Sequence, residues 1–284
     1  MFTASDVIYS SPHCIIDPTA AAETSRLWLQ HTAIYSCLNL LPLLPPDVEE
    51  QDWHLLDLAC GTGDWLFDAA FELPASMVIG IDPNVKNIDY AHAQARVRLR
   101  HNISCELMDL KGPLALPRAS FDLIYGHFLA AWLTEDEWLP LLTQCRSLLR
   151  PNGVLRLVEA TAGHCSSSAC EQLSSWYEQA LVLAGVHPTP GMLSLNVLDL
   201  LSQAGYQQIT EQVEILDFSV GCVAYHTMQK VILTFFALVQ PFVVRSGLVT
   251  EKMFEELYWL MYCELNSDDF SGCWHLRDLQ ARLC

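Results

Sequence analysis

The stretch His54–Asp64, HLLDLACGTGD, decides the fold of this chain. Its leucines form a short apolar run, and the glycines that follow favour a buried strand over a helix. Gly61 and Gly63 flank one threonine, so the backbone can turn tightly and its amides can approach a ligand that any Cβ would push away. The apolar segment 65–72 then predicts a helix. A strand, a glycine turn and a helix N-terminus form a ligand crevice in open α/β sheets.

An acidic residue follows the next apolar run. Residues 77–81 predict a second strand, and Asp82 lies about 20 residues beyond the turn, the spacing at which an acid meets ribose hydroxyls in such folds. A dinucleotide fingerprint requires a third glycine three residues after the second, but Leu66 occupies that position. A nicotinamide reductase is therefore a disfavoured alternative.

The stretch resembles instead the first motif of the class I S-adenosylmethionine-dependent methyltransferases. In that motif an acid precedes the glycine pair by four residues, as Asp57 precedes Gly61. The cofactor of that family has no pyrophosphate, so the third glycine is not expected. The resemblance implies S-adenosyl-L-methionine as the cofactor. It also implies cofactor contacts from a set of residues at the first two strand ends: Asp57, Ala59, Gly61, Thr62, Gly63, Asp82 and Pro83.

A third acid stands at the end of the next predicted strand, residues 103–108. In the resembled family an acid at this place accepts a hydrogen bond from the adenine amino group, which suits Asp109. Met108 and Leu110 could then sandwich the base. An aspartate at a strand end is also a common turn former, so both roles stay open for Asp109.

Two histidines are candidate bases. The segment 116–128, LPRASFDLIYGHF, resembles the family's fourth strand, which places Gly126 and His127 beneath the methionine part of the cofactor. His127 is the first candidate to orient or deprotonate an acceptor, because an imidazole is near half-charged around neutral pH. The alternative is that it only lines the cofactor pocket or bonds a backbone carbonyl. His164 is the second candidate, weighed against a solvent-facing loop histidine.

The order of elements predicts the architecture. Thr134 and Glu137 form a capping box for a helix that runs to residue 149, and residues 154–159 predict a fifth strand. Five strands alternating with helices imply a parallel, doubly wound α/β sheet with right-handed crossovers. The resemblance extends this to a Rossmann-like, seven-stranded sheet, mostly parallel with an antiparallel last strand. Residues 206–218 and 274–282 would supply the last two strands, the latter at an undetermined edge or interior place.

One or two helices are expected before the sheet. Asp17 as N-cap and Pro18 at the first helical position predict where they start. The resemblance implies that such a helix caps the cofactor, with Arg26 and Gln30 as contacts. A solvated helix face is the alternative for these two side chains.

Beyond the fifth strand the chain departs from a minimal methyltransferase domain. Residues 161–190 predict a lid or pocket wall, and the apolar segments 225–244 and 250–264 predict an inserted pair of helices, with Pro241 as a kink or a stop. We therefore expect three regions: 1–50, an N-terminal arm and cap helices; 51–160, the cofactor-binding core; and 161–284, the lid, remaining strands and substrate-pocket insertion.

Composition excludes several partners. The net charge of −18, from 33 acidic and 15 basic residues, would repel a nucleic-acid backbone. The eleven cysteines show no metal-ligand spacing, so no metal is expected, and they suit a reducing compartment. No secretory signal is visible, and the apolar stretch 231–239 is short of the ~20 residues that span a bilayer, so a cytoplasmic protein without a membrane span is expected.

These observations predict a methyltransferase that moves a methyl group to O, N or C of a small acceptor. The aromatic residues of the inserted helices favour a lipophilic or aromatic acceptor, although they would equally suit plain core or the contact of a homo-oligomer. The GTGD form of the turn also resembles quinone-biosynthesis C-methyltransferases. The alternative is a protein that binds the cofactor without methylating: a pseudoenzyme, a regulator or a cyclisation catalyst.

Overall fold

The computed structural model describes residues 15–17, 20–38, 52–131, 133–160, 163–185 and 197–283. The chain divides into two compact units, each discontinuous in sequence. We call the first the helical unit: Met1–Cys37, Ala162–Pro188 and Ile215–His275. We call the second the core unit: Leu38–Thr161, Thr189–Glu214 and Leu276–Cys284. The region expected at 161–284 is thus shared between the two units.

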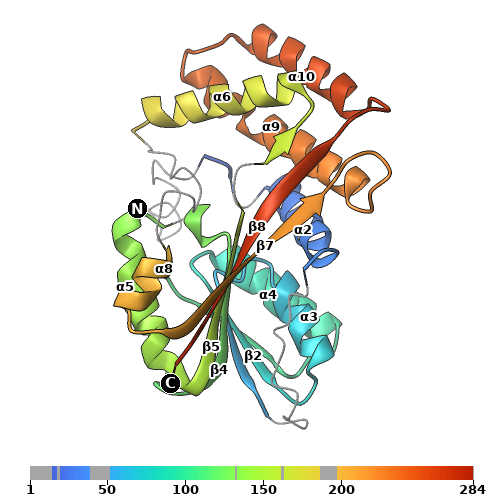
Figure 1. Cartoon of the computed structure of the whole chain (residues 1–284). Helices are drawn as coiled ribbons and strands as arrows, with labels where there is room; N and C mark the ends of the chain where they lie inside the picture. The colour runs from blue at the N-terminus through green and yellow to red at the C-terminus, as the bar shows by residue number, and fades with distance from the viewer. Residues whose placement is uncertain are drawn as a thin grey trace, which may run out of the picture. The chain divides into compact units, whose positions relative to one another are not determined.

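The core unit is built on a doubly wound parallel sheet, as predicted (Figure 1). Its strands pair in the order β3-β2-β1-β4-β5, all parallel. The strand order reverses between β1 and β4, and ligands of open α/β sheets bind at such a switch point, outside the carboxyl ends of the strands. The strands are β1 (His54–Leu58), β2 (Met77–Asp82), β3 (Ile103–Leu107), β4 (Phe121–His127) and β5 (Leu149–Ala160).

Antiparallel pairing completes the sheet. β8 (Gly272–Arg282) runs antiparallel to β5, with Leu157 opposite Leu279, which confirms the prediction for the last strand. β7 (Gln207–Asp217) also pairs with β8, so β8 is an interior strand. The sheet has eight strands rather than seven, because the two-residue β6 (His164–Cys165) pairs with the start of β8. A pair of residues carries no detectable periodicity, so the sequence pattern missed it.

Helices cover both faces of this sheet. α3 (Asp64–Glu72) and α4 (Val85–Val97) pack on one face, and α5 (Glu135–Leu148) and α8 (Val197–Gln203) on the other (Figure 1). The predicted capping box at the start of α5 is confirmed: the Thr134 amide donates to Glu137 Oε2 at 2.8 Å. A short 3-10 helix, η1 (Leu129–Ala131), follows β4.

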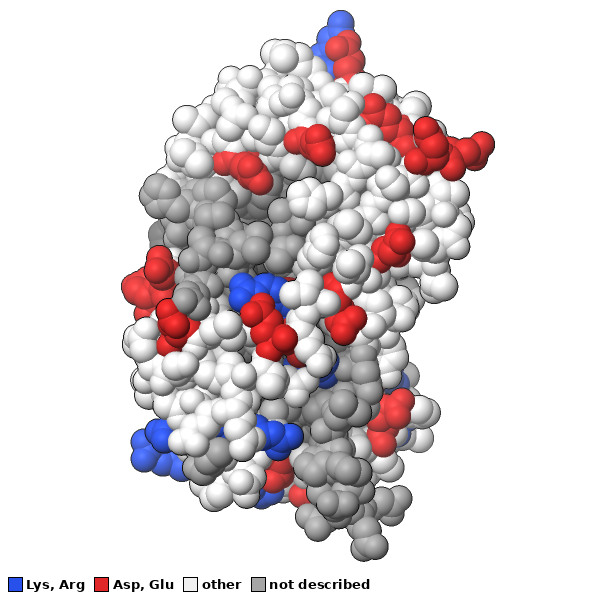
Figure 2. Space-filling model, in the orientation of Figure 1, with Lys and Arg blue, Asp and Glu red and all other residues white. Residues whose placement is uncertain are grey.

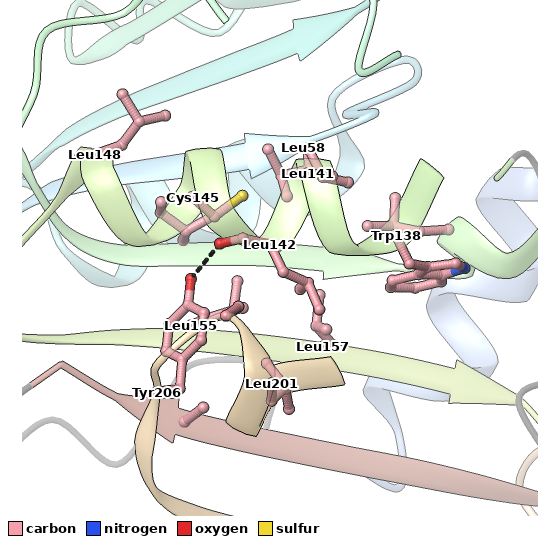
Figure 3. Close-up of a cluster of buried hydrophobic side chains, with 14 of the residues drawn as sticks. Leu58, Trp138, Leu141, Leu142, Cys145, Leu148, Leu155, Leu157, Leu201 and Tyr206 are labelled. Carbon is pink, nitrogen blue, oxygen red and sulfur yellow. Dashed lines mark hydrogen bonds between the residues drawn. The ribbon is translucent and has the colours of Figure 1, made fainter. Parts of the chain in front are cut away.

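A cluster of buried apolar side chains lies between the sheet and the helices α5 and α8 (Figure 3). The Tyr206 hydroxyl, at the start of β7, donates to the Leu142 carbonyl of α5 at 3.1 Å, so the polar tip of this ring is satisfied inside the core. The cluster joins α5, α8 and β5 through buried side chains: Trp138, Leu141, Leu142, Cys145, Leu148, Leu155, Leu157 and Leu201.

Gly80 in β2 controls the packing on the opposite face. A Cβ at this glycine would lie 2.5 Å from Leu66 Cδ1 and 2.7 Å from Cys60 Sγ. Leu66 is fully buried, so the leucine that stands where a dinucleotide fold has its third glycine occupies the space above Gly80. Close contact between helix and strand is achieved here by a glycine in the strand instead of one in the helix.

We predict that Gly80→Ala lowers the free energy of unfolding by about 1–3 kcal/mol, because the methyl group would overpack the contact between α3 and β2. Gly112→Ala is the control, since the nearest atom to its Cβ would be a carbonyl oxygen at 3.7 Å. Urea denaturation of both variants checks the prediction. Equal losses of stability in the two would contradict it.

The helical unit contains α2 (Ala21–Tyr35), α6 (Ser168–Leu183), α9 (Tyr225–Arg245) and α10 (Glu251–Leu265), with α9 in contact with the other three. The predicted N-cap at Asp17 is wrong, because Ala20 occupies the cap position. The Asp17 carbonyl instead accepts a hydrogen bond from the Ala20 amide at 3.0 Å, in a turn that precedes the helix. Pro18 and residues 39–51, where the end of any second predicted helix would fall, lie outside the described residues.

α9 does not stop at Pro241 as the sequence allowed, but continues to Arg245. Val239 and Val243 are buried on either side of the proline, so packing of the helix outweighs the loss of one hydrogen bond. By length and composition, α9 is the one helix of the described residues that could cross a membrane, and 28% of its apolar window is buried. The absence of a membrane span stays a prediction.

Candidate active site

The turn between β1 and α3 is built from left-handed backbone. Ala59, Gly61 and Gly63 have φ angles of 53°, 55° and 91°. Ala59 adopts this conformation with a side chain, which costs about 1–2 kcal/mol and was not foreseen. A Cβ at Gly61 would meet no described atom within 4 Å, so the glycine faces open space. The Thr62 hydroxyl is held by a hydrogen bond that it donates to Asp64 Oδ2 at 3.1 Å.

The Asp82 carboxylate holds this turn against the end of β2. Its Oδ2 accepts from the Gly61 amide at 2.9 Å, and its Oδ1 accepts from the Asn84 amide at 2.8 Å and Asn87 Nδ2 at 3.1 Å. Burial raises the pKa of Asp82, and these three hydrogen bonds oppose the increase. A carboxylate has about four acceptor positions, so room for one further donor remains. Pro83 is half-buried and leads into Asn84, the N-cap of α4.

Asp57, in β1, is the most unusual group of the site. Its side chain is fully buried, and neither carboxyl oxygen has a hydrogen-bond partner among the residues that the structure describes. Burial, and secondarily the Asp82 carboxyl, raises the pKa of Asp57 well above its usual value. An unpaired buried carboxyl is unfavourable, so this arrangement favours a ligand that brings a donor or a positive charge. S-adenosylmethionine carries both, and the open space beside Gly61 also fits it.

The end of β3 lies beside the end of β2, since the Met108 amide donates to the Asp82 carbonyl at 3.1 Å. Asp109 is exposed, and its Oδ1 accepts from the Lys111 amide at 3.0 Å, as in a turn-forming aspartate. Leu110 is buried and Met108 is half-buried against the core. The structure thus brings the predicted residues of β1, β2 and β3 together at one edge of the sheet.

An aromatic row lies at the end of β4. The His127 ring stacks on Tyr125 at 5.7 Å between centroids, and Tyr125 stacks on Trp65 of α3 at 4.4 Å. Gly126 is buried, and a Cβ there would lie 2.8 Å from Leu129 Cδ1. The Tyr125–Trp65 stack had no signal in the sequence, because it joins residues 60 positions apart.

Glu159, at the end of β5, is a site residue that sequence reasoning missed. Its Oε1 accepts from the Leu129 amide at 2.7 Å and the Ala130 amide at 3.3 Å, so it holds the turn that follows His127. Burial raises the pKa of Glu159 to about 8, although both amides oppose the increase. A single acid at the end of the apolar run of β5 was the signal that could have found it.

The remaining predicted residues belong to the helical unit. Arg26 donates to both oxygens of Glu23 at 2.7 Å and to Gln30 Oε1 at 2.6 Å. Its guanidinium lies 5.9 Å from the Phe235 ring centroid. Glu23 and Gln30 are buried, so this is not the solvated helix face considered above. His164 is exposed on β6.

No group of three His, Cys, Asp or Glu side chains is placed to hold a metal ion within the described ranges. Acidic side chains are scattered over the face displayed in Figure 2. Basic groups collect instead around a hollow of about 350 Å³ beside α4 and β3, lined by His92, Arg96, Arg100 and His101 among others. The predicted cofactor residues are not part of that hollow.

Residues 55–153 match the family described as Methyltransferase domain. This part of the chain is therefore similar to a methyltransferase domain, and its strand order, glycine turn and acidic strand ends fit the class I S-adenosylmethionine-dependent type.

Relatives and solved structures agree with this assignment. The chain is 30% identical over 129 residues to trans-aconitate 2-methyltransferase of Deinococcus radiodurans, covering 45% of this chain and 46% of that protein. It is 30% identical to nocamycin O-methyltransferase of Saccharothrix syringae, covering 57% and 62%. The chain thus spans less than two thirds of these relatives. Phosphoethanolamine N-methyltransferase 2 of Haemonchus contortus shares the fold, with a TM-score of 0.57 at 13% identity over 100% of this chain and 60% of that one.

We predict that Asp82→Asn weakens the binding of S-adenosylhomocysteine by about 1–3 kcal/mol, because the single acceptor oxygen of an amide cannot serve both the three donors bound by Asp82 and a ribose hydroxyl. The control is Asp122→Asn. Asp122 lies at the start of β4, away from the carboxyl strand ends, and its carboxylate accepts from the His54 amide and from Arg150 of β5. Isothermal titration calorimetry on both folded variants provides the measurement. An unchanged dissociation constant for Asp82→Asn would show that the ribose role is wrong.

A second prediction concerns pH. Because the pKa of Glu159 is raised in the folded protein, its contribution to stability is complete below about pH 4.5 and is lost as the pH rises toward 8. Relative to Glu159→Gln, which cannot ionise, the wild-type protein should lose stability in this window by at most about 1.4 kcal/mol per pH unit. Denaturation curves between pH 5 and 8 test this. Parallel pH dependences of wild type and variant would contradict it.

Proposed function

We propose that this protein is an S-adenosylmethionine-dependent methyltransferase that acts on a small molecule. The observation that carries the proposal is the buried Asp57 carboxyl, without a partner, close to a turn whose Gly61 faces open space. A cationic methyl donor satisfies both features, since it supplies charge to the carboxyl and needs close approach to the backbone.

Different residues of the core unit would bind different parts of the cofactor. Asp82 has an acceptor position left for a ribose hydroxyl, and Asp57 suits the ammonium group of the methionine part. Met108 and Leu110 offer apolar contacts to the base. When bound, the cofactor supplies a methyl group that is already activated, so the chain's own task is to align donor and acceptor and to exclude water.

We propose His127 as the general base that accepts the proton of the methyl acceptor. It stands at the end of β4, and the next turn is held by Glu159 through the Leu129 and Ala130 amides. Its ring is packed against Tyr125 and Phe128, which limits its orientations. A histidine held in this way can accept a proton from a hydroxyl or an acidic C–H near neutral pH.

Aromatic side chains of the helical unit support the proposal that the methyl acceptor is lipophilic or aromatic. Tyr177 of α6 packs edge-on against Phe235 at 5.2 Å and against Phe242 at 6.3 Å, and both phenylalanines are only half-buried. Arg26 lies over the Phe235 ring. Such a surface offers flat apolar contacts with one polar group at its edge, which suits a ring-containing natural product or a quinone better than a sugar.

The test combines binding with turnover. Thermal shift with S-adenosylmethionine, S-adenosylhomocysteine and NAD should show stabilisation by the first two only. Methyl-labelled donor is then incubated with phenols, indoles, quinones and terpenoids, and a labelled product is expected from at least one class. Binding of NAD alone would overturn the cofactor assignment, whereas binding without any transfer would favour the non-methylating alternative.

Matched glycine variants sharpen the binding assay. Gly61→Ala places a methyl group in the space reserved for the ligand and should weaken S-adenosylmethionine binding by at least about tenfold, or 1.4 kcal/mol. Gly185→Ala is the control, since Gly185 also has a positive φ, 73°, and no atom within 4 Å of its Cβ position. Both variants should suffer similar backbone strain. Equal affinity of the two for the cofactor would contradict the placement of the ligand.

A further inference from the structure

Two cysteines lie near the start of α6 in the helical unit. Cys165 ends β6, two residues before the N-cap Ser167, and Cys170 lies in the first turn of the helix. The Ser167 Oγ accepts from the Cys170 amide at 3.0 Å, while Cys165 Sγ lies 3.9 Å from the Ser167 carbonyl oxygen. The cap therefore fixes the turn that joins the two cysteines, and both of them line one hollow.

The segment between the thiols is held firmly. The Glu264 carboxylate of α10 accepts from Ser167 Oγ at 2.6 Å, Ser168 Oγ at 3.1 Å and the Ala169 amide at 3.0 Å. On the other side, the Ser166 amide donates to the Ser271 carbonyl at 2.8 Å. A reaction between the two cysteines thus begins from a fixed arrangement and requires little ordering of the chain.

The pair is open to small reagents. Cys165 and Cys170 both line a hollow of about 180 Å³, and Cys165 is only half-buried. The titratable groups around this hollow are His164, Glu171 and Glu178, and Glu264 stands behind the cap. Buried structural thiols elsewhere in the chain, such as Cys145, have no such opening among the described residues.

The two thiols differ in acidity. A hydrogen bond from the Cys170 thiol lowers the pKa of Cys165 to about 7, although burial, Glu171 and Glu264 oppose this effect. The same hydrogen bond, with burial, raises the pKa of Cys170. The thiolate is the reactive form of cysteine, so Cys165 is suited to be the nucleophile and Cys170 the thiol that follows it.

We propose that Cys165 and Cys170 form an oxidisable pair, in which Cys165 is oxidised first by hydrogen peroxide or an organic hydroperoxide. The Cys165 thiolate attacks the distal peroxide oxygen, so that an S–O bond forms as the O–O bond breaks and a sulfenic acid results. The other oxygen leaves as hydroxide or alkoxide and takes up a proton to give water or an alcohol. The Cys170 sulfur then attacks the Cys165 sulfur, and the sulfenic hydroxyl leaves as water with the Cys170 proton. The disulfide is the product of this two-electron oxidation, and reduction by a dithiol restores both thiols.

The first experiment compares thiols within the reduced wild-type protein. Limiting iodoacetamide at pH 7, followed by mass spectrometry of each cysteine peptide, should alkylate Cys165 about tenfold faster than the exposed Cys263, which belongs to the same unit. As the pH is lowered, the alkylation rate of Cys165 should drop near pH 7, whereas the alkylation rate of an ordinary thiol drops at a higher pH. Cys165 reacting no faster than Cys263 would overturn the proposal.

The second experiment follows oxidation. Peroxide-treated wild type should yield a Cys165–Cys170 cross-linked peptide that is two hydrogen atoms lighter and disappears with dithiothreitol. Cys170→Ser should accumulate a sulfenic acid at Cys165 that dimedone traps, and Cys165→Ser should form neither product. Cys263→Ser is the control and should behave as wild type. Absence of the cross-link in wild type would show the pair to be unreactive, and a dimedone adduct at Cys170 in Cys165→Ser with none at Cys165 in Cys170→Ser would show that the roles are wrongly assigned.

Discussion

The hydrogen bond from the Gly61 amide to the Asp82 carboxylate is the interaction on which the site depends. It joins the turn after β1 to the end of β2, and the same carboxylate receives the amide that starts α4. One side chain therefore sets the shape of the cofactor turn and the direction of the next helix. The charge that would bind a sugar also organises the protein before any ligand arrives, which is a form of preorganisation.

The packing of α3 beneath the turn also depends on a close approach between neighbouring elements. Leu66 at the start of α3 can approach the sheet only because Gly80 in β2 has no side chain. Dinucleotide folds obtain this closeness from a third glycine in the turn, whereas this chain moves the glycine to the neighbouring strand. The backbone beside Gly61 stays open, while the helix behind it is anchored by a large apolar group.

Besides Asp82, the buried carboxyls of Asp57 and Glu159 lie at the carboxyl edge of the sheet, and these two differ in their hydrogen bonding. Glu159 is supported by the Leu129 and Ala130 amides, so it stabilises the turn after His127. Asp57 has no hydrogen-bond partner within the described part of the chain. Burial raises the pKa of both groups, which is unfavourable for folding near neutral pH. Such groups concentrate where a ligand or a reaction needs them, and here both stand at the strand ends around the switch point.

The sequence by itself determined the features that depend on neighbours in the chain: the alternation of strands and helices, the glycine turn, the acid at Asp82 and the capping box at Thr134. Periodicity and turn chemistry are local, so one sequence contains them. The tertiary structure alone decided the interior place of β8 and the strained Ala59. It also decided which buried polar groups have partners, with Glu159 bonded to amides about 30 residues away and Asp57 to none. Those outcomes depend on contacts between distant segments, and no local pattern records them.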